Sequence, residues 1–463
     1  MDSIVTSLIE KARAAQRHYE TYDQAAVDAV VTAAGWAIMQ PERNRILAEM
    51  AVRDTGLGVV ADKVTKNHRK TLGLLRDLKG AKSVGVIAEY PELGIVEIAR
   101  PVGVVAAITP STNPGATPAN KIINALKGRN AVIIAPSPKG ASTCAALLGF
   151  ISAELEKLGA PAGLVQMLPA PITKEATHAL MRQADLVVAT GSQANVRAAY
   201  ASGTPAFGVG AGNVAAIIDS SANLADAAAA IARSKTFDNA TSCSSENSVV
   251  ILDSIYDAAM AELAKAGGVL LDATEKSLLQ ATMWHGGKLN PQTTAQSTAM
   301  ISMLAGLTRP ETANAAFLMV SETGAGPACP FSGEKLAPVM AVYRARDFDH
   351  ACRIVADIYA FQGAGHSVSI HSADDEHILR LGLELPVSRV IVNQIHCYAT
   401  GGNFDNGLPF SLSMGCGTWG RNNFSDNMNY RHYLNITRIS RKIPPREPAL
   451  EEIFGEHFRK YGK

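Results

Sequence analysis

The sequence predicts an α/β protein built on a parallel, doubly wound sheet. Between residues 102 and 183, short apolar runs alternate with longer segments of helical periodicity. This alternation is typical of strands that helices cover on both faces. Glycine, proline and hydroxyl residues collect directly after those runs, where ligands bind in such sheets. At 463 residues the chain is also too long for one ordinary core, so we expect more than one domain.

Residues 1–101 are predicted to hold helices followed by a hairpin. Apolar residues recur at helical spacing between residues 3 and 54, which predicts two helices. Two alternating runs, 84–89 and 94–100, flank a turn at 90–93. They predict a β-hairpin over about residues 83–101, at an edge of the fold.

Three units of strand then helix follow the hairpin. The predicted pairs are 102–108 with 117–127, 130–135 with 141–158, and 164–168 with 173–183. Two further strands of this sheet are expected at 186–189 and 214–218. After a helix near 224–232, a second α/β block occupies about residues 248–386. The late segment 430–440 alternates like a strand, although no partner lies nearby in the sequence.

Charge and cysteine usage limit the function classes. The chain carries 43 basic and 42 acidic side chains, without a basic run or interleaved aromatic residues. A nucleic-acid or anionic-membrane partner is therefore not expected, whereas small molecules and further copies of the chain are. Six cysteines without a close-spaced pair, and no recognisable secretory or membrane-spanning segment, predict a reducing cytoplasm.

One cysteine lies in an unusually polar segment. Hydroxyl and amide side chains flank Cys243 on both sides, and the apolar run 249–252 follows. A structural cysteine is expected among apolar neighbours, whereas polar surroundings can stabilise a thiolate. We therefore predict that Cys243 is a reactive thiol on a loop that leads into a buried strand, a structural role being the alternative.

No metal site is predicted. The other five cysteines lack hydroxyl-rich surroundings and metal-ligand spacing. His371, Glu376 and His377 are spaced like metal ligands, but no second ligand pair supports them. We interpret this stretch as a solvated helix.

Four loops at the ends of predicted strands suit a dinucleotide. They are Thr109–Pro114, Pro136–Lys139, Thr190–Ser192, which opens a helix and could hold a phosphate on its amides, and Gly208–Asn213. Each loop alone could be an ordinary turn. No G-x-G-x-x-G follows the first strand, which argues against an ordinary Rossmann dehydrogenase.

Seven short motifs occur in order along the chain. They are Thr-Asn-Pro at 112–114, Lys-Gly-Arg-Asn at 127–130, Ala-Thr-Gly at 189–191, the Cys243 loop, Gly-Ala-Gly-His at 363–366, Val-Asn-Gln at 392–394 and Gly-Cys-Gly-Thr-Trp-Gly at 415–420. By these motifs, nearly the whole chain resembles the CoA-acylating aldehyde dehydrogenases. Within them it resembles most the branch that acts on succinic semialdehyde or sulfoacetaldehyde.

The resemblance implies the aldehyde dehydrogenase fold. An atypical Rossmann domain for the nicotinamide cofactor would span residues 1–235, including the hairpin, and a catalytic cysteine domain 236–429. Residues 430–463 would supply a strand and tail that return to the cofactor domain and join the hairpin in an intersubunit sheet. A homodimer or homotetramer follows as an expectation.

The resemblance also implies a mechanism. Cys243 would attack the aldehyde carbon, and the Asn113 side chain and the Cys243 amide would stabilise the oxyanion. Hydrolytic relatives carry a water-activating glutamate before the cysteine, but residues 207–210 here are Phe-Gly-Val-Gly. The thioester would therefore pass to coenzyme A as co-substrate. His366 would handle the proton or orient the incoming thiol, because an imidazole titrates near working pH.

The expected cofactor is NADP, with NAD possible. Its predicted contacts are Thr109, Pro110, Ser137, Pro138, Lys139, Gly191, Ser192, Gly210 and Glu334. Glu334 resembles the family's glutamate that contacts the nicotinamide ribose, a surface turn being the alternative. Ser137 and Lys139 lack a nearby carboxylate for the ribose 2′-hydroxyl, which favours NADP.

The aldehyde is predicted to be short and anionic. Arg421 matches the succinic semialdehyde branch and could bind a carboxylate or sulfonate in bidentate fashion. Sulfoacetaldehyde or succinic semialdehyde is therefore preferred over acetaldehyde or propionaldehyde. The alternatives are that Arg421 packs elsewhere or contacts cofactor phosphate, and that the enzyme is hydrolytic and releases the free acid.

Overall fold

Four helices precede the first sheet in the computed structural model, which describes residues 2–463. They are α1 (Asp2–Tyr19), α2 (Gln24–Met39), α3 (Pro41–Thr55) and α4 (Val60–Leu78). The sequence predicted only two helices before residue 55, because the break at Pro41 was missed. Proline lacks an N–H and suits the first helical position, and the Gln40 side chain accepts from the Arg43 amide to cap α3. The helix α4 was not predicted.

The first sheet has five parallel strands within the described residues, in the order β5-β4-β3-β6-β7. Its strands are β3 (Val104–Thr109), β4 (Ala131–Pro136), β5 (Val165–Met167), β6 (Leu186–Ala189) and β7 (Ala206–Gly208). Its helices are α5 (Ala116–Lys127), α6 (Ala141–Glu156), α7 (Lys174–Gln183) and α8 (Gln193–Tyr200). Every residue of β3 and β4 is buried, which confirms the predicted sheet with helices on both faces.

The second sheet of the described chain has seven parallel strands in the order β10-β13-β14-β9-β8-β15-β16. Its strands are β8 (Val214–Ile218), β9 (Glu246–Leu252), β10 (Gly268–Leu270), β13 (Phe317–Ser321), β14 (Val339–Ala345), β15 (Val368–His371) and β16 (Val390–Val392). The placement of β8 corrects the prediction, which made it the fifth strand of the first sheet. The chain therefore changes sheets between residues 208 and 214, not at residue 235.

Helices surround the second sheet, and a two-residue hairpin ladder extends from it. The helices are α9 (Leu224–Thr236), α10 (Tyr256–Lys265), α11 (Ala273–Met283), α12 (Thr298–Ala305), α13 (Pro310–Asn314), α14 (Phe348–Phe361), α15 (Asp375–Glu384) and α16 (His396–Ala399). The small ladder is β11 (Trp284–His285) with β12 (Lys288–Leu289). Across residues 2–463, no helix combines the length and the apolar character that a membrane span requires.

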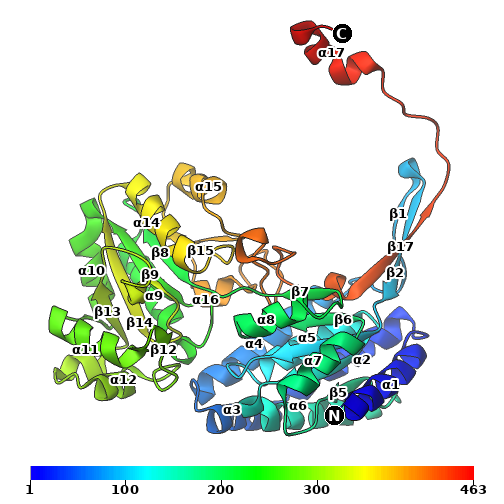
Figure 1. The fold of residues 1–463 in the computed structure, drawn as a ribbon, viewed down its shortest axis with the longest axis horizontal. Helices are drawn as coiled ribbons and strands as arrows, with labels where there is room; N and C mark the ends of the chain where they lie inside the picture. Colours follow the sequence, from blue (N-terminus) through cyan, green and yellow to red (C-terminus); the bar gives the residue numbers. More distant parts are fainter. Residues whose placement is uncertain (1) are drawn as a thin grey trace.

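A third, antiparallel sheet projects from the body (Figure 1). It consists of β1 (Gly85–Tyr90), β2 (Ile95–Pro101) and β17 (Leu434–Ser440). The hairpin is therefore not part of either parallel sheet. Its partner is β17, the late alternating segment for which no partner strand lay nearby in the sequence. After β17 an extended stretch leads to α17 (Leu450–Tyr461), which lies apart from both parallel sheets and has no buried residue.

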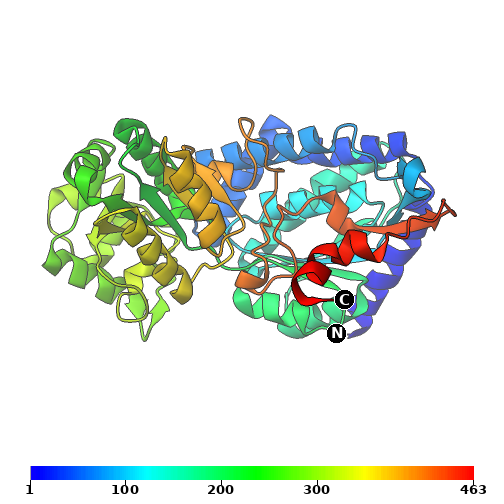
Figure 2. The same cartoon turned by 90° about the horizontal axis from the view of Figure 1, so that it is seen from above.

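The two parallel sheets lie side by side, and residues of the 390–430 region pass between them (Figure 2). Separate apolar cores support the two halves. The loops at the carboxyl ends of β3, β4 and β6, together with the Cys243 loop, meet at this junction. The fold thus places the predicted loops around one region.

Candidate active site

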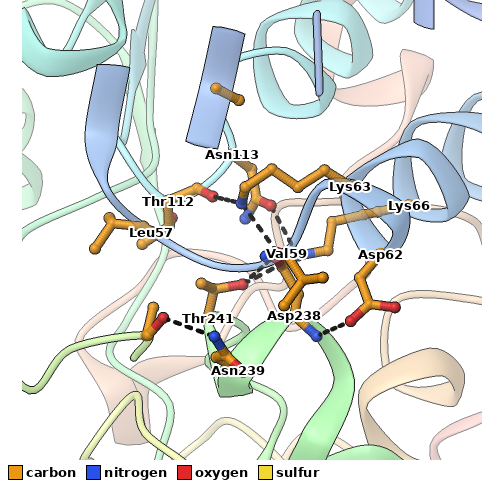
Figure 3. Close-up of polar contacts among 12 residues, drawn as sticks. Leu57, Val59, Asp62, Lys63, Lys66, Thr112, Asn113, Asp238, Asn239 and Thr241 are labelled. Carbon is orange, nitrogen blue, oxygen red and sulfur yellow. Dashed lines mark hydrogen bonds and ion pairs between the residues drawn. The ribbon is translucent and has the colours of Figure 1, made fainter. Parts of the chain in front are cut away.

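The Cys243 loop begins with a strained backbone. Asp238, Asn239 and Ala240 follow one another with φ angles of 54°, 50° and 58°, a region that costs energy for side chains other than glycine. Contacts with the N-terminal helices hold this conformation: the Asp238 amide donates to Asp62 Oδ2 at 2.7 Å (Figure 3). The loop is therefore positioned by a helix about 175 residues earlier in the chain.

A buried ion pair fixes α4 against the loop (Figure 3). The Asp238 carboxylate lies 2.6 Å from Lys66 Nζ and 3.1 Å from Lys63 Nζ, and all three side chains are almost fully buried. The Thr241 hydroxyl also donates to this carboxylate, at 2.6 Å. Burial alone would raise the pKa of Asp238, but Lys66 and Lys63 outweigh it and keep the pKa below its ordinary value.

The same lysine orients the predicted oxyanion donor. Lys66 Nζ donates to Asn113 Oδ1 at 2.9 Å (Figure 3). An amide whose oxygen is bound in this way has only its NH₂ group left to offer. Within residues 2–463, no other side chain binds that NH₂ group. Asn113 is therefore prepared to donate to a developing negative charge.

Cys243 and His366 come together from different elements. The Cys243 sulfur lies 3.5 Å from His366 Nε2, and His366 Nδ1 lies 2.7 Å from the Ser367 hydroxyl. Burial, and next the charge of Glu334, raises the pKa of the Cys243 thiol to about 12. Burial, and next the charge of Arg389, lowers the pKa of His366 to about 3.

These pKa directions correct two expectations. The polar neighbours of Cys243 suggested a stabilised thiolate, but the packed surroundings dominate and keep the thiol neutral. His366 was expected to titrate near working pH, but it stays neutral there because it is buried. The site without ligands thus holds a neutral thiol beside a neutral imidazole.

Two glycines permit the close packing of this site. A Cβ on Gly212 would collide with the Cys243 carbonyl oxygen, and one on Gly365 would collide with that of Cys416. Gly365 also has a φ of +87°, which glycine adopts without strain. The glycine-rich segments before β8 and before His366 therefore serve the close approach of backbones.

Glu334 lines a cavity of about 660 Å³ that also contacts Gln362, Phe361 and Trp284. Burial raises the pKa of this carboxyl to about 8, although Lys235 and Lys335 oppose the shift. Its charge also acts on the Cys243 thiol. The Glu334 side chain is half-buried and faces this cavity.

The predicted cofactor loops gather at one edge of the first sheet. Thr109 pairs with Pro136 in register, the Ser137 amide donates to the Thr109 carbonyl, and Pro110 lies beside Gly191. Ser192 caps α8, which the sequence predicted as a helix start. Pro138 and Lys139 follow in an exposed turn before α6.

A carboxylate that the sequence did not reveal lies close to this edge. Asp54, at the end of α3, accepts hydrogen bonds from Ser142 and Thr143 in the first turn of α6. No carboxylate lies near Lys139 in the sequence, but the fold brings Asp54 to the helix turn that follows Lys139.

Gly210 and Arg421 belong to two loops that contact each other. The Gly210 amide donates to Asn422 Oδ1 at 3.0 Å, and the Cys416 amide donates to the same oxygen at 2.9 Å. Arg421 is exposed with a φ of 58°, and no ion pair involves it within residues 2–463. The structure therefore brings Gly210 close to Cys416, whereas the Arg421 side chain is exposed and covers no part of the site.

The metal-like spacing near residue 371 has a structural explanation. His371 is buried at the end of β15, so the interpretation of a solvated helix is wrong for this residue. Asp219, Asp374 and His377 form a cluster, but Asp219 accepts from Ser221 and Ser372, and Asp374 caps α15. The His377 ring stacks on Phe348 at 3.7 Å. Hydrogen bonds and stacking thus account for the cluster.

The residues that sequence reasoning missed lie mostly on α4. Lys63, Lys66, Arg69 and Lys70 form a basic face, and a small pocket beside Asn113 and Ser242 is lined by the last three. The detectable signal was their spacing of three and four residues, which places them together on a helix. Because this helix was not predicted, the spacing could not be interpreted as a shared helix face.

Comparisons with known proteins agree with this arrangement. The model of the aldehyde dehydrogenase family matches residues 2–277. A sulfoacetaldehyde dehydrogenase (acylating) of Cupriavidus necator is 65% identical over 459 residues, which cover 99% of this chain and 93% of that protein. A succinate-semialdehyde dehydrogenase (acetylating) of Clostridium kluyveri is 39% identical over 97% of this chain and 99% of its own length. The crystal structure of an acetylating aldehyde dehydrogenase from Geobacillus thermoglucosidasius superposes with a TM-score of 0.93 at 36% identity, covering 97% of this chain and 98% of that one.

Proposed function

The chain belongs to the aldehyde dehydrogenase family, and we propose that it is an acylating enzyme that oxidises sulfoacetaldehyde to sulfoacetyl-CoA. One observation carries the acylating part of the proposal. Cys243 contacts His366, while the segment expected to hold the water-activating acid, residues 207–210, offers no carboxylate. The substrate is inferred from the acylating relative with 65% identity.

In the first half-reaction, the Cys243 sulfur adds to the aldehyde carbon after losing its proton. His366 is the base for that proton, because its neutral Nε2 lies 3.5 Å from the sulfur and Ser367 binds the other ring nitrogen. The Asn113 NH₂ group and the Cys243 amide stabilise the oxyanion. A nicotinamide cofactor, when bound beside this carbon, would supply the hydride acceptor, and loss of the hydride would leave the acyl group on Cys243 as a thioester.

In the second half-reaction, the thiol of CoA attacks the thioester carbon and Cys243 leaves as thiolate. His366, after releasing the first proton to solvent, accepts the proton of the incoming thiol and returns it to the leaving Cys243 thiolate. Water is a poorer nucleophile that needs a general base. Residues 207–210, where the water-activating acid is expected, offer no carboxylate for that purpose. The thioester therefore survives until CoA arrives.

NADP is the proposed cofactor, with Lys139 as the residue that attracts the 2′-phosphate. The exposed position of Lys139 after β4 supports this role. Asp54 already accepts from Ser142 and Thr143, which reduces its availability to a ribose hydroxyl. Rates with NADP and NAD should shift toward NAD in Lys139→Ala. An unchanged ratio there, with a changed ratio in Asp54→Asn, would assign the choice to Asp54.

Assembly with a second copy is also proposed. The sheet β1-β2-β17 and the helix α17 extend away from the body, as a segment that packs on a partner subunit would. The six cysteines are all free thiols, in keeping with a cytoplasmic location.

The substrate proposal is tested by a panel of aldehydes. Purified enzyme receives NADP, CoA and either sulfoacetaldehyde, succinic semialdehyde, acetaldehyde or propionaldehyde, and acyl-CoA products are identified by mass spectrometry. The highest kcat/KM is expected for sulfoacetaldehyde. Equal values for the anionic and neutral aldehydes would refute this substrate, and release of free acid without CoA would support the hydrolytic alternative.

A further inference from the structure

A small pocket beside the catalytic loop is lined by three basic side chains and, within residues 2–463, by no carboxylate. Lys66, Arg69 and Lys70 approach it from one face of α4. Asn113 and Ser242, the residue before Cys243, line the same pocket. An anion in this pocket would therefore stand next to the oxyanion donor and the thiol.

The two lysines have little hydrogen-bonding capacity left. An ammonium group has three donors. Lys66 Nζ uses them on Asn113, Asp238 and Thr241. Lys70 Nζ uses them on three backbone carbonyls, those of Tyr398, Gly401 and Gly402. Lys66 is also paired with Asp238, and burial lowers the pKa of Lys70 to about 7, so neither lysine offers the pocket a free N–H group or a full unpaired charge.

Arg69 differs from both lysines. A guanidinium group has five N–H donors, and within residues 2–463 the Asn403 side-chain oxygen is its single hydrogen-bond acceptor. No carboxylate of the described chain pairs with Arg69. Its guanidinium carbon lies 4.6 Å from the centre of the Tyr398 ring and 5.6 Å from that of Phe404. Stacking between two rings holds the donors in place without using them.

The size of the pocket favours a short anionic group. Its volume is about 40 Å³, which is room for about three water-sized groups. In sulfoacetaldehyde one methylene separates the carbonyl carbon from the sulfonate. A substrate of that length needs its anion site directly beside the oxyanion site, and Lys66 joins the two by bonding Asn113.

We propose that Arg69 binds the sulfonate of the aldehyde and thereby selects a short anionic substrate, an inference that rests on the proposed function. The planar guanidinium can donate two parallel N–H bonds to two sulfonate oxygens. In this account Arg69, and not Arg421, determines the selection for an anion.

The test compares Arg69→Gln and Arg69→Lys with the unmodified enzyme. For Arg69→Gln we expect kcat/KM for sulfoacetaldehyde to fall by about 30- to 1,000-fold, mainly through KM, because a desolvated charge partner is lost. With propionaldehyde, a neutral aldehyde of similar size, the change should stay within about threefold. Arg69→Lys should recover part of the loss, since it restores the charge without the fork.

Arg76→Gln is the matched control. Arg76 lies on the same helix, also contacts Asn403, and pairs with Asp77 at 2.8 Å. Its substitution should change neither substrate's kinetics. A parallel fall with both aldehydes in Arg69→Gln would reveal a structural role and overturn the proposal. Loss of anion selection in Arg421→Gln, with selection retained in Arg69→Gln, would overturn it as well.

A competition measurement separates this proposal from the proposed function. Isethionate, which carries a hydroxyl where the aldehyde group would be, is titrated against propionaldehyde turnover. It should inhibit the unmodified enzyme competitively. Its inhibition constant should be at least 30-fold higher for Arg69→Gln than for the unmodified enzyme. Absence of competition would refute the anion pocket even if sulfoacetaldehyde were a substrate. Competition without sulfoacetaldehyde turnover would refute the function and support the pocket.

Discussion

At the scale of single residues, the site is governed by burial. Cys243 and His366 are both neutral because packed surroundings disfavour their charged forms. In the proposed mechanism, the thiol transfers its proton to the imidazole only when an aldehyde is present for the resulting thiolate to attack. Such an arrangement protects the cysteine from oxidation between turnovers, because the thiolate is the reactive form.

His366 should therefore stay unprotonated over a wide pH range. Its pKa of about 3 means that lowering the pH from 8 to 5 does not protonate it, so the rate of acyl transfer to CoA should show no inflection near pH 6.5. His366→Gln should lower that rate by about 10²- to 10⁴-fold. Rapid-mixing kinetics across this pH range measure both effects, with His377→Gln as the control imidazole. An inflection near pH 6.5 that disappears in His366→Gln would contradict this view.

Glu334 should release a proton when the cofactor binds. Its pKa of about 8 in the empty site leaves it mostly protonated at pH 7. Ribose hydroxyls that donate to it would favour the carboxylate and lower its pKa, so binding should release close to one proton and strengthen from pH 6.5 toward pH 8. Calorimetry in buffers of different ionisation enthalpy counts the protons. Equal release by Glu334→Gln would assign them to another group.

The pKa values of these residues were beyond sequence reasoning. The polar neighbours of Cys243 in the chain suggested a stabilised thiolate, whereas burial in the folded protein, and next the charges of Glu334 and Cys416, raise the pKa of the thiol. Motifs could identify Cys243, Asn113 and His366 because their types and order are distinctive. Their electrostatic surroundings are made by tertiary contacts that the motifs do not encode.

At the scale of elements, α4 connects the N-terminal helices to the catalytic loop. Asp238 pairs with Lys63 and Lys66, and Lys66 orients Asn113. The strained φ angles at residues 238–240 persist because these contacts compensate for them. One ion pair thus positions both the loop that carries the thiol and the oxyanion donor.

Replacing Asp238 by Asn tests this connection. Asparagine keeps the shape and tolerates a positive φ, but it leaves two buried ammonium groups without a countercharge. The free energy of unfolding should fall by about 3–5 kcal/mol, and kcat should fall as Asn113 loses its orientation. Urea denaturation and steady-state kinetics measure the two effects. Asp62→Ala, which removes only the more accessible contact to the Asp238 amide, should cost about 1–2 kcal/mol.

An equal and small loss in both variants would contradict the structural role of the ion pair. Restored stability in the double variant Asp238→Asn with Lys63→Met would support it, because one of the uncompensated charges is then removed.

Element boundaries failed where tertiary contacts decide them. The strands β3 to β6, β8 and β9 were predictable because buried parallel strands are continuous apolar runs, whereas β7 and the other five strands of the second sheet were not assigned individually. The membership of β8 was not predictable, since Val214–Ile218 is equally apolar in either sheet and its pairing with β9 and β15 decides the matter. The helix α4 was missed because its basic residues face inward, against the usual pattern of an apolar buried face.

At the scale of the whole molecule, the C-terminal helix α17 projects away from the two parallel sheets. Leu450 and Ile453 of α17 are 57% and 60% exposed, and Figure 1 shows the helix far from both parallel sheets. An isolated helix of 12 residues is marginally stable in water. These apolar side chains are the ones that the proposed assembly with a second copy would bury.

Polar substitution of this helix should weaken assembly. Replacing Leu450, Ile453 and Phe454 by Ser removes the apolar side of α17, so sedimentation analysis should show a shift toward smaller species at micromolar concentration. Glu451→Ala with Glu452→Ala is the matched control and should leave assembly unchanged. A monomeric unmodified protein, or unchanged assembly in the Ser variant, would show that α17 does not join subunits.

The central claim is that the acyl group on Cys243 goes to CoA and not to water. Intact-mass spectrometry of the enzyme after mixing with sulfoacetaldehyde and NADP, first without CoA and then with it, tests this claim most directly. We predict a long-lived acyl adduct that is absent in Cys243→Ala and is discharged as acyl-CoA once CoA is added. Rapid loss of the adduct as free acid before CoA is added would contradict the account.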